Sequence, residues 1–344
     1  MAMYSFQNDY SEGAHPDILA ALQRCNLEQN IGYGLDDHSL RAAELIKARF
    51  GCADADVHFL MGGTQVNQTA IAAFLRPHQA VISAADGHIY VHEAGAIEAT
   101  GHKILPVSSP DAKLTPTGIE AVLAEHGGDE HMVQPRLVYL SNATDMGAAY
   151  TLGELEAIAA CCRQNSLLLY LDGARLGQAL MADGVGMQPE DIARLCDAFY
   201  IGGTKNGMLL GEALVIVNDA LKADFRYLIK QRGAMMAKGF VVGLQFEAAF
   251  AGTLYFDLAA HANAMAARLA EGIENHGGRL LLPQQTNMIY PVLPLTAIAE
   301  LEKKFRFYVR GFRDGKTASL RMVTSWVTSK EKIDTFLERL EQLM

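Results

Sequence analysis

The segment 198-AFYIGGTKNGMLLGEALVIV-217 places a glycine-rich turn with one lysine, Lys205, between two short apolar runs. Similar apolar runs, bounded by turn residues and followed by stretches of helical periodicity, occur at 79–84, 136–141 and 167–172. Runs of this kind predict strands buried on both faces, and their alternation with helices predicts a largely parallel sheet covered by helices. We therefore expect an α/β fold.

The sequence changes character beyond about residue 235. It predicts one long helical stretch interrupted only around Gly252, then two strands and a terminal charged helix. These segments are 239–277, 286–293, 318–327 and the residues from Ser329 onward. We expect a large domain over residues 1–235, which includes the N-terminal segment, and a linking helix with a small α+β domain over residues 236–344.

The composition excludes several classes of protein. Of the 344 residues, 50% are hydrophobic and 20% are charged, a balance that excludes intrinsic disorder. The 39 acidic and 29 basic residues give a net charge of −10, so we expect no nucleic-acid partner. The five cysteines form no CxxC pair and have no histidines at metal-ligand spacing, so we expect neither disulfides nor a zinc site. Without a signal pattern or a long apolar stretch, we expect a cytoplasmic protein that does not contact membranes.

Polar residues follow three of the expected strands, at the edge of the sheet where ligands bind in such folds. They are Asn142 and Thr144, Asp172 and Arg175, and Lys205. Partial desolvation lowers the pKa of a lysine at this edge and favours the neutral amine that a Schiff base needs. An aspartate at the end of a buried strand needs a cationic or hydrogen-bonding partner. The plainer alternatives are a solvated turn lysine and an Asp172–Arg175 ion pair that caps the next helix.

The segment 61-MGGTQVNQTAIAAFL-75 introduces an apolar helix with two glycines and a threonine. The first-turn amides, with Thr64 and Gln65, would bind a phosphate through the helix dipole. The alternative is an ordinary N-terminal helix cap.

Two further candidates lie outside these strands. His88 and His92 share the i, i+4 spacing of a zinc helix, but the acid between them that such a motif supplies is absent. We instead expect the His88 imidazole to lie on a cofactor ring or to transfer protons. Arg321 is a candidate for carboxylate binding, or else a partly exposed strand arginine.

Four segments, taken in order, carry a resemblance to a known family. They are GGTQVN at 62–67, HIYVHEAG at 88–95, DGAR at 172–175 and Lys205, with further matches at 7–9, 33–37, 286–288 and 320–324. They resemble the threonine aldolase and beta-eliminating lyase family of the fold-type I pyridoxal phosphate enzymes. The resemblance spans nearly the whole chain. It implies a PLP-dependent lyase that cleaves the Cα–Cβ bond of threonine or allo-threonine to glycine and acetaldehyde, commonly as a homotetramer built from dimers.

The resemblance also implies roles for individual residues. Lys205 would form the Schiff base with pyridoxal 5'-phosphate, Asp172 would pair with the pyridine nitrogen, and His88 would stack on the ring. Further cofactor contacts are expected from Gly63, Thr64, Gln65, Asn142, Thr204 and Lys238. The substrate carboxylate is expected to bind Asn8, Arg175 and Arg321.

The chain departs from the family pattern at three places. The family stretch ENTHN appears here as 141-SNATDMG-147, so its histidine, often assigned to the aldol chemistry, is absent. Thr204 stands before the lysine where serine is usual. Lys238 is the only cation in a turn where the family has an arginine that reaches a phosphate.

These departures leave the base at the β-hydroxyl open. The candidates are His88, His92 and a water held by Thr144 and Asp145. The alternative reactions are β-elimination or transamination of another small amino acid, in which Lys205 removes the Cα proton. A non-catalytic PLP-binding protein is the last alternative.

Overall fold

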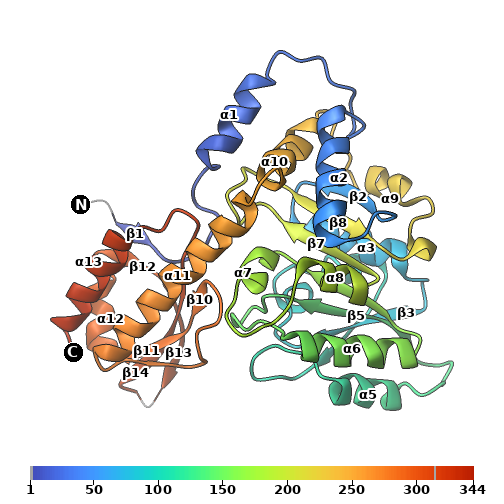
Figure 1. Cartoon of the computed structure of the whole chain (residues 1–344). Helices are drawn as coiled ribbons and strands as arrows, with labels where there is room; N and C mark the ends of the chain where they lie inside the picture. Colours follow the sequence, from blue (N-terminus) through green and yellow to red (C-terminus); the bar gives the residue numbers. More distant parts are fainter. Residues whose placement is uncertain (1–2, 314) are drawn as a thin grey trace.

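A seven-stranded sheet forms the centre of the larger part of the molecule (Figure 1). The computed structural model describes residues 3–313 and 315–344. The strands of this sheet are β2 (Asp56–Leu60), β3 (Gln79–Ala84), β4 (Ile104–Val107), β5 (Gln134–Ser141), β6 (Leu168–Asp172), β7 (Ala198–Gly202) and β8 (Glu212–Ile216). Their order across the sheet is β2-β8-β7-β6-β5-β3-β4.

The sheet is mainly parallel, which confirms the predicted α/β class. Strands β4, β3, β5, β6 and β7 pair in parallel, whereas β8 is antiparallel to both β7 and β2. All the predicted strands of this sheet form at or within two residues of the expected positions. The edge strands β2 and β4 and the reversed direction of β8 are additions, because periodicity identifies a strand but not its partner or its direction.

Helices cover both faces of the sheet, and side chains alternate between two apolar layers because successive strand residues point to opposite faces. Val138, Leu171 and Phe199 lie in one layer, while Tyr139 and Tyr170 lie in the other. The first layer includes residues of α2 (Asp37–Phe50), α5 (Pro116–Glu125), α6 (Leu152–Gln164), α8 (Pro189–Leu195) and α10 (Phe240–Phe250). The second includes residues of α3 (Gly63–Phe74) and α9 (Phe225–Gln231).

A smaller antiparallel sheet lies in the C-terminal part of the chain, beside the long helix α11 (Leu254–Asn275) (Figure 1). Its strands are β9 (Arg279–Leu280), β10 (Met288–Ile289), β11 (Pro291–Pro294), β13 (Tyr308–Arg313) and β14 (Thr317–Val323). The helices α12 (Leu295–Leu301) and α13 (Lys330–Glu341) contribute to its apolar core. The strand predicted at 318–327 is shorter than expected, because β14 ends at Val323.

The first residues of the chain also pack on this C-terminal part. Strand β1 (Tyr4–Ser5) pairs in parallel with β12 (Phe305–Arg306), and the buried Phe6 contacts Phe305 and Phe336. Conversely, α10 lies beyond residue 235 but contributes to the core of the large sheet. The domain boundary at residue 235 stays a prediction.

Two further expectations concern the cysteines and membrane-spanning segments. All five cysteines are free and buried. Among the described helices, none combines the length and the apolar character needed to cross a bilayer.

Candidate active site

Two adjoining cavities lie where the strands β2, β5, β6 and β7 end. Their volumes are about 480 Å³ and 280 Å³. The residues that line both are Tyr10, His88, Asp145, Arg175 and Lys205. The structure thus brings the predicted lysine, histidine and arginine to one place, at the sheet edge where the sequence analysis expects chemistry.

Asp172 ends β6 and lies at the floor of the smaller cavity, almost fully buried. Its carboxylate accepts hydrogen bonds from the Tyr139 hydroxyl at 2.5 Å, the Asn67 amide at 3.0 Å and the Ala174 backbone N–H at 3.0 Å. Burial opposes ionisation, but His88 and hydrogen bonds from Tyr139, Tyr200 and the Ala174 N–H hold the pKa of Asp172 below its ordinary value. Asp172 is therefore ionised at neutral pH and suited to pair with a protonated ring nitrogen.

His88 is the first residue of α4 (His88–Val91) and is oriented by a buried glutamate. Its Nδ1 lies 2.7 Å from Oε1 of Glu93, which also accepts a hydrogen bond of 2.8 Å from Asn67. Burial disfavours the imidazolium, but Glu93 and Asp172 raise the pKa of His88. Because Asn67 donates to both carboxylates, His88, Glu93, Asn67 and Asp172 form one network.

Lys205 lies in the turn after β7. A second buried glutamate, Glu212, accepts hydrogen bonds from this turn. The Gly203 N–H and the Thr204 hydroxyl each donate to Glu212, both at 2.9 Å. Burial and the neighbouring Arg175 guanidinium lower the pKa of Lys205. The geometry therefore favours the neutral amine that covalent chemistry with a carbonyl needs.

The beginning of α3 lines the opposite side of the smaller cavity. Gly62, Gly63 and Thr64 face it, and no side chain caps this helix end. A Cβ on Gly63 would lie 2.9 Å from the Tyr200 hydroxyl, so the close approach requires glycine. First-turn amides at a helix N-terminus form an anion site.

These groups fit pyridoxal 5'-phosphate. The smaller cavity offers amides for a phosphate at Gly63 and Thr64, a carboxylate for the ring nitrogen at Asp172 and an amine for the carbonyl carbon at Lys205. The flat imidazole of His88 lines the same cavity and can lie against a ring.

The two predicted carboxylate-binding arginines differ in their surroundings. Arg175 is buried, and Asp9 accepts from its Nε at 2.7 Å and its Nη2 at 3.0 Å. Asn287 also donates to Asp9, at 2.9 Å. Arg321 lines the larger cavity, with its Nη1 donating to the Gln7 carbonyl at 3.0 Å. Arg175 is thus held rigidly, while Arg321 is tethered through one nitrogen to the N-terminal segment.

Four predicted site residues lie outside the residues that line the two cavities. The Asn142 side-chain oxygen accepts from the Tyr150 backbone N–H at 3.1 Å, and the Asn8 oxygen is occupied by its own turn. Gln65 accepts from the backbone just before its helix, and Lys238 is exposed. Within this chain these side chains are directed elsewhere, so their roles stay predictions.

The position of the missing family histidine is occupied by two residues with different surroundings. Thr144 is buried and donates its hydroxyl to the Asp111 carbonyl at 2.9 Å. Asp145 lines both cavities, and its buried Oδ2 has no hydrogen-bond partner among the described residues. Of these two residues, Asp145 is the one that lines the cavities.

Five supporting residues escaped the sequence analysis: Asp9, Asn67, Glu93, Tyr139 and Glu212. The sequence carries one signal for Tyr139, because three of the apolar runs have a tyrosine in the middle. In the structure, Tyr139 lies opposite Tyr170 on the neighbouring strand. Glu93 and Asn67 lie inside quoted motifs without an assigned role. Nothing local marks Asp9 or Glu212 as buried.

Comparisons with known proteins show which family this chain resembles. A model of the beta-eliminating lyase family matches residues 10–294. The low specificity L-threonine aldolase of Pseudomonas aeruginosa is 32% identical over 334 residues, which cover 95% of this chain and 94% of that protein. The low specificity L-threonine aldolase of Saccharomyces cerevisiae is 29% identical, covering 82% of this chain and 73% of its own.

Solved structures are also similar to this chain. The Leishmania major threonine aldolase superposes with a TM-score of 0.97 at 50% identity, over 99% of each chain. An aspartate aminotransferase of Thermus thermophilus superposes with a TM-score of 0.74 at 16% identity, a likeness that shows the fold alone.

Proposed function

Because this chain belongs to the beta-eliminating lyase family and has the fold-type I architecture of pyridoxal phosphate enzymes, we propose that it cleaves threonine or allo-threonine to glycine and acetaldehyde. The observation that carries the proposal is that Lys205, Asp172 and His88 line one cavity together with a further carboxylate, Asp145, whose buried Oδ2 has no partner among the described residues. The first three serve pyridoxal phosphate chemistry in general. The fourth can serve a substrate that bears a hydroxyl.

The residues of this chain divide the work of the reaction. Bound pyridoxal phosphate supplies an electron sink for a bond broken at Cα. Asp172 keeps a proton on the ring nitrogen, and Lys205 provides the amine for covalent attachment. Arg175 and Arg321 bind the substrate carboxylate, and this contact fixes which Cα bond breaks. His88 covers the ring in an orientation set by Glu93.

Asp145 takes the role of the base at the β-hydroxyl in this proposal. Asp145 lines both cavities, so its carboxylate can accept the proton of a substrate hydroxyl there. His92 also lines the larger cavity, and burial lowers its pKa, which leaves it neutral and able to accept a proton. A substitution distinguishes the two.

Changing Asp145 to Asn removes the base and keeps the shape of the side chain. We expect kcat for threonine cleavage to fall about 10²-fold, the effect of losing a positioned base, with cofactor binding unchanged. The measurement is steady-state acetaldehyde release, with Thr144→Ser as the neighbouring control. A near-normal kcat in Asp145→Asn together with a large loss in His92→Gln assigns the base to His92.

The products of the holoenzyme test the reaction itself. With threonine or allo-threonine we expect equal amounts of glycine and acetaldehyde, because the site holds an acceptor for the β-hydroxyl. Acetaldehyde, ammonia and keto acids are measured separately over a panel of small amino acids. Ammonia and keto acid in equal amounts, without acetaldehyde, overturn the proposal in favour of β-elimination. Keto acid without ammonia overturns it in favour of transamination.

The assembly and location of the protein are part of the same proposal. Large apolar side chains are exposed along the N-terminal arm, residues 16–40, and the largest exposed fraction is 92% at Leu27. They are Leu19, Leu27, Ile31, Tyr33, Leu35 and Leu40. Exposed apolar groups that gather on one segment support a homo-oligomer, a dimer or a tetramer. The five free cysteines support a reducing, cytoplasmic location.

A further inference from the structure

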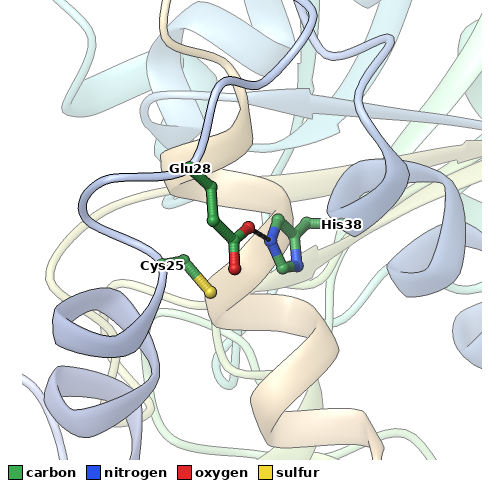
Figure 2. Close-up of side chains that lie close together, drawn as sticks. All are labelled: Cys25, Glu28 and His38. Carbon is green, nitrogen blue, oxygen red and sulfur yellow. Dashed lines mark hydrogen bonds and ion pairs between the residues drawn. The ribbon is translucent and has the colours of Figure 1, made fainter.

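Three side chains with metal-binding atoms meet on the N-terminal arm, away from the catalytic cavities. Cys25 directly follows α1 (Pro16–Arg24), Glu28 lies in the loop after it, and His38 lies in the first turn of α2 (Figure 2). The Cys25 sulfur, a Glu28 carboxylate oxygen and a His38 ring nitrogen all lie within 4.8 Å of one another. None of the three residues lines either catalytic cavity.

The imidazole of His38 is held in one orientation by a residue of α10. Its Nδ1 lies 2.6 Å from Oε2 of Glu247 and 2.8 Å from Nη2 of Arg41, whose Nε donates to the other oxygen of Glu247 at 2.6 Å. The Nε2 therefore faces Glu28, at 2.9 Å. A histidine that ligates a metal through one nitrogen typically donates the other N–H to a carboxylate, and Glu247 occupies that second place.

The exposure of the three residues suits an ion that enters from solvent. Cys25 and His38 are buried, with exposed fractions of 8% and 7%, whereas the Glu28 side chain is half exposed. A thiol, an imidazole and a carboxylate together make a donor set that zinc binds well, whereas calcium and magnesium prefer oxygen ligands alone.

We propose that Cys25 Sγ, Glu28 and His38 Nε2 bind one zinc ion, with water as the fourth ligand. The sequence analysis expects no zinc site, because the ligands follow no compact spacing and His38 stands thirteen positions after Cys25 (38 minus 25). The fold brings them together at the junction of α1, α2 and α10.

Zinc binding at this site is an exchange of protons and waters without a change of oxidation state. Burial and Glu28 raise the pKa of the Cys25 thiol, and Glu28 and Glu247 raise the pKa of His38 against the effect of burial. The hydrated ion releases waters, the thiol loses its proton to become a thiolate, and the imidazolium loses the proton on Nε2. Both protons pass to solvent.

The ion would fix the N-terminal arm to the body of the protein. Helix α1 packs on α10 through a small apolar cluster, Ala21, Cys25 and Leu244. A metal that joins the end of α1 to the start of α2 closes the loop between them and adds a second attachment. Its effect is therefore on stability rather than on turnover.

Metal content of the holoenzyme tests the site. The PLP-loaded protein is treated with a chelator, dialysed and titrated with zinc, and then with cobalt, whose visible spectrum reports a thiolate ligand. We expect one zinc per chain, a melting temperature that falls on chelation, and a cobalt–thiolate band. Cys25→Ser should weaken zinc binding about 100-fold, and Glu247→Gln about 10–100-fold.

Two variants separate a metal site from a general loss of structure. Cys52→Ser replaces a cysteine of equal burial, 8% exposed, and should keep the zinc, the band and the response to chelator. Glu28→Gln changes a half-exposed side chain that tolerates substitution, and should lose the zinc while it stays folded. No binding by the wild type, or equal binding by both Cys25→Ser and Glu28→Gln, overturns the proposal.

Discussion

Changing Lys205 to Ala should abolish the visible absorbance of the bound cofactor and lower threonine cleavage by about 10⁴-fold, the upper range for a positioned proton-transfer group. The physical reason is that Lys205 is the lysine that lines both cavities, and burial beside Arg175 lowers its pKa toward the reactive neutral amine. The absorbance spectrum of the purified variant with added pyridoxal phosphate is the direct measurement, and acetaldehyde release is the second.

A matched lysine serves as control. Lys222 contacts Asp219 and lies outside the cavities, so Lys222→Ala should keep both the spectrum and the rate. If Lys205→Ala retained the absorbance band, the covalent attachment would have to be assigned to another amine. Circular dichroism of both variants shows that the comparison is made on folded protein.

Changing Asp172 to Asn should lower kcat by about 10³-fold, the size of effect seen when a preorganised electrostatic contact is removed. An amide keeps the volume of the carboxylate and can still accept the Tyr139 hydrogen bond, but it carries no negative charge to hold a proton on the ring nitrogen. The charge of Asp172 also raises the pKa of His88, so the variant should lower that pKa as well. The measurements are kcat, cofactor affinity and the titration of His88 by NMR.

The control for this change is another carboxylate that supports the sheet. Asp197 directly precedes β7 and does not line either cavity. Its carboxylate accepts a hydrogen bond of 2.8 Å from the Leu169 N–H. Asp197→Asn should cost stability with little loss of kcat. Equal rates for Asp172→Asn and the wild type would remove Asp172 from the catalytic machinery.

The parts of the structure that the sequence predicts are those governed by local patterns. Short apolar runs identified the central strands, and polar residues after them identified Asp172, Arg175 and Lys205 as neighbours in space. A separate argument, from the affinity of a helix N-terminus for anions, drew attention to the glycines at the beginning of α3, which line the smaller cavity. The inferences about the strands depend only on strand periodicity and on the rule that ligands meet the carboxyl ends of a parallel sheet.

The rest depends on contacts between distant residues, which periodicity does not encode. The buried partner of Arg175 is Asp9, 166 positions away, although the sequence analysis weighed Asp172 for that place. Asn67 connects Glu93 to Asp172 through hydrogen bonds between residues 26 and 105 positions apart. The domain division at residue 235 stays a prediction, and no local pattern encodes the pairing of β1 with β12 in the C-terminal part.

That pairing sets the order in which the chain can fold during synthesis. Tyr4 lies opposite Phe305, and the Tyr4 hydroxyl donates to Thr328, contacts that span more than 300 positions. Asp9 follows this strand closely, so the carboxylate that immobilises Arg175 reaches its place only after the C-terminal sheet has been made. Contacts of such sequence separation are slow to form. The ribosome therefore releases almost the entire chain before Asp9 holds Arg175 in place.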